Sequence, residues 1–270
     1  MELLKRVGSA AVFLPLFVLL VARGPRWGFA LLVIVIALLA MGEFCRMVRA
    51  AGHDVNRPLA LCLGAALVIA FVVPWPWFLP LILSAGVGVL LAAGIVSRSS
   101  GPGSNEPVGA ALALLGAMYV SWPLGHSLWL LSLSHGVQLV LLLVLITWGS
   151  DASAYLVGAT LGRRPLCPMI SPKKTVEGAF GGLAGAIVAA LIGRAWFYGD
   201  LALSHALTLG VLLGIFGLLG DLSESVMKRA GGIKDTGGLI PGHGGVLDRI
   251  DSLLFTTPAL YYYARLGIGG

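Results

Sequence analysis

The stretch WGFALLVIVIALLAMGEF, residues 27–44, consists almost entirely of apolar side chains. A helix that crosses the hydrocarbon core of a membrane needs about 20 such residues. Comparable runs recur along the chain, which has 270 residues, 58% of them hydrophobic and only 11% charged. A soluble domain has about 25% charged residues. We therefore predict an all-α protein, a polytopic integral membrane helical bundle.

The apolar runs predict about nine transmembrane helices, separated by turns that Pro74, Pro76 and Pro123 help to mark. The expected spans are residues 8–22, 27–44, 58–73, 77–96, 107–123, 137–159, 177–196, 203–220 and 251–266. We expect the N-terminal helices in residues 1–136. The remainder, residues 137–270, carries the two longest polar loops, 160–176 and 221–250.

The distribution of basic residues predicts the orientation of the chain. With a cytoplasmic N-terminus, 14 of the 18 Lys and Arg residues fall in cytoplasmic segments. The four in outside segments are Arg23, Arg26, Arg194 and Arg265. Cytoplasmic loops are enriched in Lys and Arg, so this bias favours an odd number of spans and places both long loops in the cytoplasm. The net charge of +6 is scattered, so we expect contacts with membrane lipids and no nucleic-acid partner.

The loop 221–250 gathers the polar side chains that this apolar chain otherwise lacks. Asp221, Glu224, Ser225 and Lys228 share one helix face, and Gly231-Gly232 is expected to end that helix. A loop with seven glycines between positions 231 and 245 follows. Such loops let backbone N–H groups surround a phosphate.

Charged side chains accompany these glycines. Arg229 and Lys234 can neutralise phosphate, and Asp235, Asp248 and Asp251 offer hard oxygen donors. Mg²⁺ is usually held by one or two carboxylates together with phosphate oxygens. The pattern therefore predicts a metal–nucleotide site, although Asp248 or Asp251 could instead cap the last helix. His243 could be a phosphate ligand, an acid/base group or a turn residue.

A second polar stretch lies upstream. Asp151 falls within the sixth span, where an ionisable residue indicates function. The segment ISPKKTVEGAFGG, residues 170–182, supplies Lys173 and Lys174, which bind phosphate or simply anchor the helix on the positive side of the membrane. Thr175 and Glu177 do not fit a capping box.

Several glycines are spaced for close helix packing. They are Gly178, Gly182, Gly181 and Gly185 in the seventh span, and Gly210, Gly214 and Gly217 in the eighth. Packing within the chain is one use of such faces, and a homodimer is the other.

The sequence SVMKRAGGIKDTGGLIPGHGGVLDRID, residues 225–251, resembles throughout the signature of the phosphatidate cytidylyltransferase family, the CDP-diacylglycerol synthases. SPKKTVEG, residues 171–178, and the segment 151–155 are also similar to that family. The resemblance implies Mg²⁺-dependent transfer of the cytidylyl group from CTP to phosphatidic acid, which gives CDP-diacylglycerol and pyrophosphate for phospholipid biosynthesis. It also implies an integral protein of the bacterial inner membrane.

Together, the residue types and the resemblance assign the expected site. The expected catalytic residues are Asp221, Lys228, Arg229, Lys234, Asp235, His243, Asp248 and Arg249. The expected substrate-binding residues are Ser171, Lys173, Lys174, Ser225, Gly242, Gly244 and Gly245. The expected metal ligands are Asp221, Asp248 and Asp251.

Two alternatives stay open at this point. A CTP-dependent polyprenol or phytol kinase would handle metal and nucleotide in the same way but would phosphorylate an alcohol. A transporter for an anionic solute would explain the cations and Asp151, but not the concentration of carboxylates and cations in one glycine-rich loop.

Overall fold

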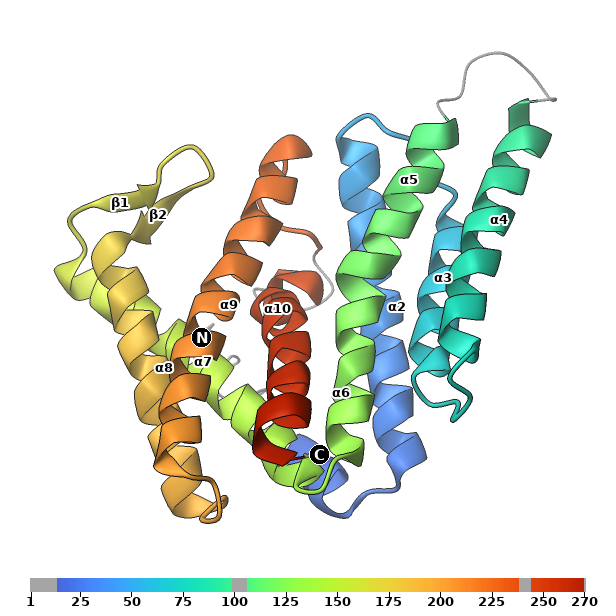
Figure 1. Cartoon of the computed structure of the whole chain (residues 1–270). Coiled ribbons are helices and arrows are strands. Elements are labelled where there is room, and N and C mark those ends of the chain that lie inside the picture. The colour runs from blue at the N-terminus through green and yellow to red at the C-terminus, as the bar shows by residue number, and fades with distance from the viewer. Residues whose placement is uncertain (1–13, 99–105, 238–243, 270) are drawn as a thin grey trace. The chain divides into compact units, whose positions relative to one another are not determined.

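The computed structural model describes residues 14–98, 106–237 and 244–269 (Figure 1). Gly242 and His243, two of the expected site residues, lie outside these ranges. After a short helix, Leu14–Arg23, the helices are α2 (Arg26–Ala50), α3 (Arg57–Ala70), α4 (Phe78–Arg98), α5 (Glu106–Gly116), the π-helix η1 (Ala117–Ser121), α6 (Trp122–Ser132), α7 (Gly136–Leu161), α8 (Val176–Trp196), α9 (Leu203–Ala230), α10 (Leu247–Tyr263) and the π-helix η2 (Ala264–Gly269). The strands are β1 (Pro165–Cys167) and β2 (Ser171–Thr175).

The structure confirms a helical membrane protein but not the count of nine spans. Within the described ranges, six helices are long and apolar enough to cross a membrane. The other three predicted spans coincide with shorter helices, Leu14–Arg23, α3 and α10. The count of nine therefore stays a prediction, because within the described residues these three helices have 10 to 17 residues.

Pro123 does not mark a turn, as the sequence analysis expected. The helix that begins near Pro107 continues to Ser132 and passes through Pro123. Proline removes one backbone donor and crowds the preceding turn, which usually ends or kinks a helix. Here the π-helix η1 comes directly before α6, so the turn that precedes Pro123 is not a regular α-helical turn.

The loop 160–176 contains a short antiparallel hairpin, so the protein is not helical throughout. Figure 1 shows the hairpin as β1 and β2, in which Pro165 is opposite Thr175 and Cys167 is opposite Ser171. The sequence did not predict it, because SPKKT has no alternation of apolar and polar residues. The hairpin joins the end of α7 to the start of α8.

The chain forms two compact units, each built from two separate pieces of sequence. The first comprises residues 1–128 and 227–249, and the second comprises residues 129–226 and 250–270. Both α9 and α10 contribute residues to each unit. In the first unit, α3 packs on α2, with Met41, Phe44 and Leu67 fully buried.

Glycines allow close helix packing in the second unit, as the sequence predicts. α7 and α8 pack along one another, and an added Cβ at Gly181 would lie 2.5 Å from the Cβ of Val157. On α9, a Cβ at Gly210 would lie 2.6 Å from the Cα of Ile187 on α8. These faces are therefore occupied by contacts inside the chain.

The end of α9 also agrees with the sequence. Gly232 has a φ of 64°, a left-handed conformation that suits glycine. The N–H of Ile233 donates to the carbonyl of Lys228 over 3.0 Å, which satisfies a terminal carbonyl of the helix. The helix thus stops where Gly231-Gly232 was expected to stop it, and the glycine-rich loop begins there.

Candidate functional site

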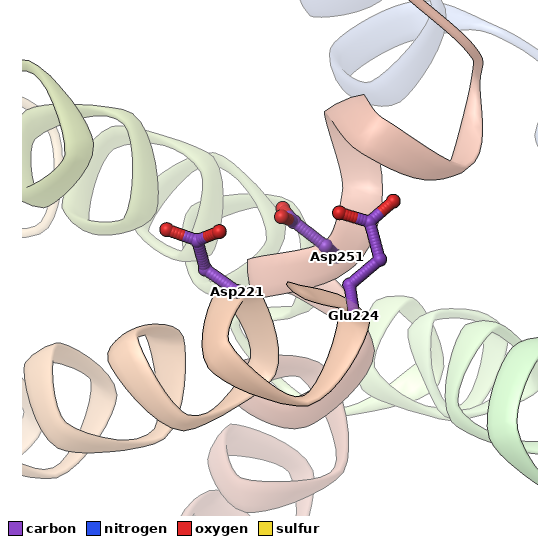
Figure 2. A group of neighbouring side chains, drawn as sticks. All are labelled: Asp221, Glu224 and Asp251. Carbon is purple, nitrogen blue, oxygen red and sulfur yellow. The ribbon is translucent and has the colours of Figure 1, made fainter. Parts of the chain in front are cut away.

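Three carboxylates from α9 and α10 converge in the second unit. Asp221 and Glu224 lie one turn apart on α9, and Asp251 faces them from α10 (Figure 2). One oxygen from each of the three lies within 4.8 Å of the others. Glu224 and Asp251 are buried, and Asp221 is half-buried. We call Asp221, Glu224 and Asp251 the acidic cluster.

Gly220 makes this convergence possible. A Cβ at this position would collide with the carbonyl oxygen of Asp251 and would lie 3.1 Å from the Cα of Ser252. The backbone of α10 therefore approaches α9 at a point where no other residue fits. The close approach brings Asp251 beside Asp221 and Glu224.

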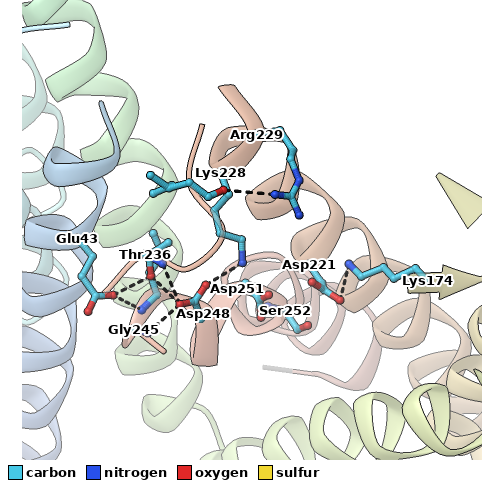
Figure 3. A network of polar contacts seen from close by, with 12 residues as sticks. Glu43, Lys174, Asp221, Lys228, Arg229, Thr236, Gly245, Asp248, Asp251 and Ser252 are labelled. Atoms are coloured by element: carbon cyan, nitrogen blue, oxygen red, sulfur yellow. Dashed lines mark hydrogen bonds and ion pairs between the residues drawn. The ribbon is translucent and has the colours of Figure 1, made fainter. Parts of the chain in front are cut away.

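The acidic cluster has the donor chemistry of a divalent cation site. Carboxylate oxygens are the ligands that Mg²⁺ prefers. Buried like charges repel one another unless a cation neutralises them. A cation of the chain lies beside the cluster: the Nζ of Lys174, on β2, is 2.6 Å from Oδ2 of Asp221 (Figure 3). The residues present therefore fit a bound Mg²⁺, with Lys174 beside it.

Asp151 also borders this cluster, which accounts for an ionisable residue in the middle of a predicted span. It lies on α7, and the hydroxyl of Ser252 donates to its Oδ1 over 3.5 Å. Ser252 directly follows Asp251 on α10. Asp151 thus adds a fourth carboxylate to the surroundings of the acidic cluster.

Asp248, in the first unit, has a different environment. Its Oδ1 accepts from the Nζ of Lys228 over 2.7 Å. Its Oδ2 accepts from the backbone N–H of Gly245 over 2.7 Å, and from the N–H and hydroxyl of Thr236 over 3.1 and 3.0 Å (Figure 3). The carboxylate is therefore surrounded by donors from α9 and from both ends of the loop.

Glu43 was not among the predicted site residues, yet it belongs to this network. It lies on α2, its side chain is 1% exposed, and its Oε2 accepts from the N–H of Leu247 over 2.8 Å and from the hydroxyl of Thr236 over 3.2 Å. Its signal in the sequence is a single carboxylate in an apolar span, which is costly in a membrane. Thr236 gives no such signal.

The hairpin that carries Lys173 and Lys174 is held at its base by Glu177. Oε2 of Glu177 accepts from the N–H groups of Arg163 and Arg164 over 2.9 and 3.1 Å. Thr175 caps α8 by accepting from the N–H of Gly178 over 3.1 Å. The cap forms without a capping box, in agreement with the sequence analysis.

The remaining predicted residues are more dispersed. Ser225 is buried on α9, and Ser171 is half-buried at the start of β2. A Cβ at Gly244, which has a φ of 75°, would lie 2.8 Å from Oδ2 of Asp248. The exposed ones are Lys173, Arg229, Lys234, Asp235 and Arg249.

Glu224 is the residue that the predicted metal set lacked. The sequence placed it on the same helix face as Asp221, and its position one turn away was the available signal. Asp248, which the predicted set included, is hydrogen-bonded outside the acidic cluster. Its role as a metal ligand stays a prediction.

The helices and the acidic cluster define a polytopic membrane protein with three carboxylates that could hold a metal ion. The sequence pattern of the cytidylyltransferase family matches residues 4–266. This chain therefore belongs to the cytidylyltransferase family.

Curated relatives agree with that family. The chain is 38% identical over 254 residues to the uncharacterized protein YnbB of Escherichia coli, an alignment that covers 91% of this chain and 82% of the relative. It is 35% identical over 293 residues to a phosphatidate cytidylyltransferase of Synechocystis, with 97% and 96% covered. It is 43% identical over 132 residues to a phosphatidate cytidylyltransferase of Bacillus subtilis, with 49% of each chain covered.

Proposed function

We propose that this protein transfers the cytidylyl group of CTP to phosphatidic acid, giving CDP-diacylglycerol and pyrophosphate for phospholipid biosynthesis. The observation that carries the proposal is the acidic cluster with Lys174 beside it, in a chain similar over nearly its whole length to a phosphatidate cytidylyltransferase. The reacting region is residues 137–270, with loops 160–176 and 221–250.

The reaction depends more on neutralising the charge of the phosphates than on proton transfer. An oxygen of the lipid phosphate attacks the α-phosphorus of CTP, the bond from that phosphorus to the bridging oxygen breaks, and pyrophosphate leaves with the electron pair. The nucleophile is already an anion, so no general base has to generate it. Positioning and electrostatic stabilisation carry the catalysis of such phosphoryl-type transfers.

In this proposal the acidic residues bind the metal ion and the basic residues bind the phosphates. Asp221, Glu224 and Asp251 would hold Mg²⁺, which supplies neutralisation of the phosphate oxygens when bound. The proposed phosphate-binding cations are Lys173 and Lys174 of the hairpin, Lys228 and Arg229 of α9, and Lys234 of the loop. Asp248, a predicted metal ligand, also keeps Lys228 in place through their 2.7 Å ion pair.

The site faces the cytoplasm in this proposal, in a bacterial inner membrane. The support is the excess of Lys and Arg in the segments that a cytoplasmic N-terminus would place inside. CTP then enters from the cytoplasm, and phosphatidic acid enters laterally from the inner leaflet. A homodimer is not part of the proposal, because the glycine faces that suggested it pack inside the chain.

The test uses purified protein in detergent with phosphatidic acid, labelled CTP and Mg²⁺, with and without EDTA. We expect label in the lipid phase and released pyrophosphate, both abolished by EDTA. Folded protein that transfers no label would overturn the proposal. Phosphorylation of an added polyprenol would then indicate a lipid kinase, and flux of an anionic solute without chemistry would indicate a transporter.

A further inference from the structure

Glu43 is a buried carboxylate that the proposed reaction leaves without a task. It lies near the end of α2, and its side chain is 1% exposed. The ion pair with Arg46 is long, at 3.6 Å, and Arg46 is 46% exposed. Burying a carboxylate is costly unless hydrogen bonds compensate. The contacts that Glu43 makes should therefore matter to the molecule.

The first contact holds the start of α10. Oε2 of Glu43 accepts from the N–H of Leu247, the first residue of that helix, over 2.8 Å. The first N–H groups of a helix have no partner within the helix, and the N-terminus favours negative charge. Glu43 thus caps α10 from a helix 204 residues earlier in the chain. Asp248 is the next residue along α10.

The second contact reaches Asp248 through one hydroxyl group. The Oγ1 of Thr236 lies 3.2 Å from Oε2 of Glu43 and 3.0 Å from Oδ2 of Asp248. A hydroxyl has a single proton, so it donates to one of these carboxylates at a time. The backbone N–H of Thr236 donates to Asp248 as well, over 3.1 Å. Thr236 therefore links the two carboxylates: its N–H donates to Asp248, and its hydroxyl donates either to Asp248 or to Glu43.

Two glycines of the loop allow its backbone to approach the side chain of Glu43 closely. A Cβ at Gly237 would lie 2.6 Å from Oε1 of Glu43. A Cβ at Gly245 would collide with both Oε2 of Glu43 and Oγ1 of Thr236. Some of the loop glycines thus serve contact with a buried carboxylate, and the N–H of Gly245 is used by Asp248.

We propose that Glu43 is a positioning residue for the cytidylyl transfer, and that it acts through Thr236 and the start of α10 to hold Asp248 and Lys228. The inference rests on the proposed function. Glu43 touches neither substrate nor metal in this scheme. Its loss misplaces the cation Lys228, which lowers turnover while leaving the binding of the lipid unchanged.

The experiment compares four variants with the wild type in the labelled-CTP assay. Partners that orient a reacting group typically change activity about 10- to 100-fold. We expect kcat to fall to that extent in Glu43→Leu, less in Glu43→Gln, whose amide oxygen still accepts, and about tenfold in Thr236→Val. Thr236→Ser, which keeps the hydroxyl, should stay within about twofold of wild type. KM for phosphatidic acid should not change in any of them.

Two further measurements separate positioning from loss of fold. Phe44→Leu is the matched control: Phe44 is the next residue of α2, is 1% exposed and lies outside the network. It should lower thermal stability without lowering kcat per folded molecule. The double variant Glu43→Gln/Thr236→Val should be no slower than the slower single variant, because residues in one network do not act additively.

Several outcomes would overturn the inference. They are unchanged kcat in Glu43→Leu and Thr236→Val, strictly additive effects, or activity that only follows the folded fraction, as in Phe44→Leu. Hydrogen exchange over residues 244–250 gives a readout independent of turnover, and it should be at least about tenfold faster in Glu43→Leu. If the wild type transfers no cytidylyl group, the proposed function fails. Unchanged exchange would instead sink the placement of α10 by Glu43.

Discussion

Asp248 and Asp251 are one turn apart on α10, yet their carboxylates have opposite surroundings. Asp248 accepts from Lys228, Thr236 and Gly245. Asp251 instead shares its space with Asp221 and Glu224. A carboxylate surrounded by donors stabilises the fold by itself, whereas a carboxylate among carboxylates requires a cation. One short motif therefore supplies both a structural anchor and a candidate metal ligand.

The largest expected effect comes from removing the charge of Glu224, the member of the acidic cluster that the sequence did not predict as a metal ligand. Glu224→Gln keeps the volume and removes the charge. Removing one preorganised electrostatic group typically lowers kcat by about 100- to 1000-fold, and we expect a loss of this size together with a higher Mg²⁺ requirement. Lipid-phase label measured over a Mg²⁺ titration checks it.

Asp200→Asn is the control, because Asp200 is an exposed carboxylate in the segment between α8 and α9. It should retain full activity. A Glu224→Gln enzyme with wild-type turnover and an unchanged Mg²⁺ titration would exclude Glu224 from the metal set.

The second effect concerns stability at Asp248. Asp248→Ala removes the carboxylate that lies 2.7 Å from the Nζ of Lys228, whose side chain is 14% exposed, and it removes the acceptor of two backbone N–H groups. Removing one member of a buried pair costs about 3 kcal/mol. The free energy of unfolding should fall by about that amount in a denaturant titration in detergent without Mg²⁺.

The double variant Lys228→Met/Asp248→Ala should recover part of that loss, because the buried cation is then removed together with the carboxylate opposite it. Equal stabilities for the single and double variants would mean that the ion pair is not what makes Asp248 important for stability.

The third expected effect is a gain in stability, in contrast to the loss expected for Asp248→Ala. In EDTA, Asp251→Asn should raise the free energy of unfolding by about 1 kcal/mol, because it removes one of several mutually repelling buried charges. The amide oxygen can still accept the N–H of Ser252, as Oδ1 does over 2.6 Å. Thermal unfolding with and without Mg²⁺ measures this, and Mg²⁺ should cancel the gain. A lower stability of Asp251→Asn in EDTA would mean that Asp251, like Asp248, stabilises the fold without a metal ion.

The smallest effect is expected at a third kind of carboxylate, on the surface. Glu177 accepts from the N–H groups of Arg163 and Arg164 at the base of the hairpin that carries Lys174. Exposed charge interactions are weak, so Glu177→Gln should raise KM for CTP only about two- to threefold. Steady-state kinetics at varied CTP tests it, and a loss as large as that of Glu224→Gln would contradict this ranking.

Local chemistry made much of the fold predictable. The apolar runs identify the helical membrane protein, Gly231-Gly232 ends α9 as expected, and Gly181 and Gly210 mark close helix contacts. Helix length was less readable, because Arg57–Ala70 is as apolar as a full span but too short. The turn predicted at Pro123 was wrong, because the π-helix before it cannot be recognised from these residue types.

The site was predictable in residue type but not in pairing. Asp221, Asp251 and Lys174 were all expected, and the structure places them together. Lys228 and Asp248 are 20 residues apart and Glu43 and Leu247 are 204 apart. Such pairings depend on which helices pack, and no local pattern in one sequence records that.

The link between Glu43 and Leu247 also has a consequence for how the protein is made. The ribosome completes α2 long before the chain reaches Thr236 and Leu247, which lie 193 and 204 residues later. At about 5–20 residues per second, that interval lasts about 10–40 s. During this time α2 is in place with its carboxylate still lacking both donors. A helix that is synthesised early thus acquires its last contacts late, and a chain truncated before Thr236 would never supply these donors.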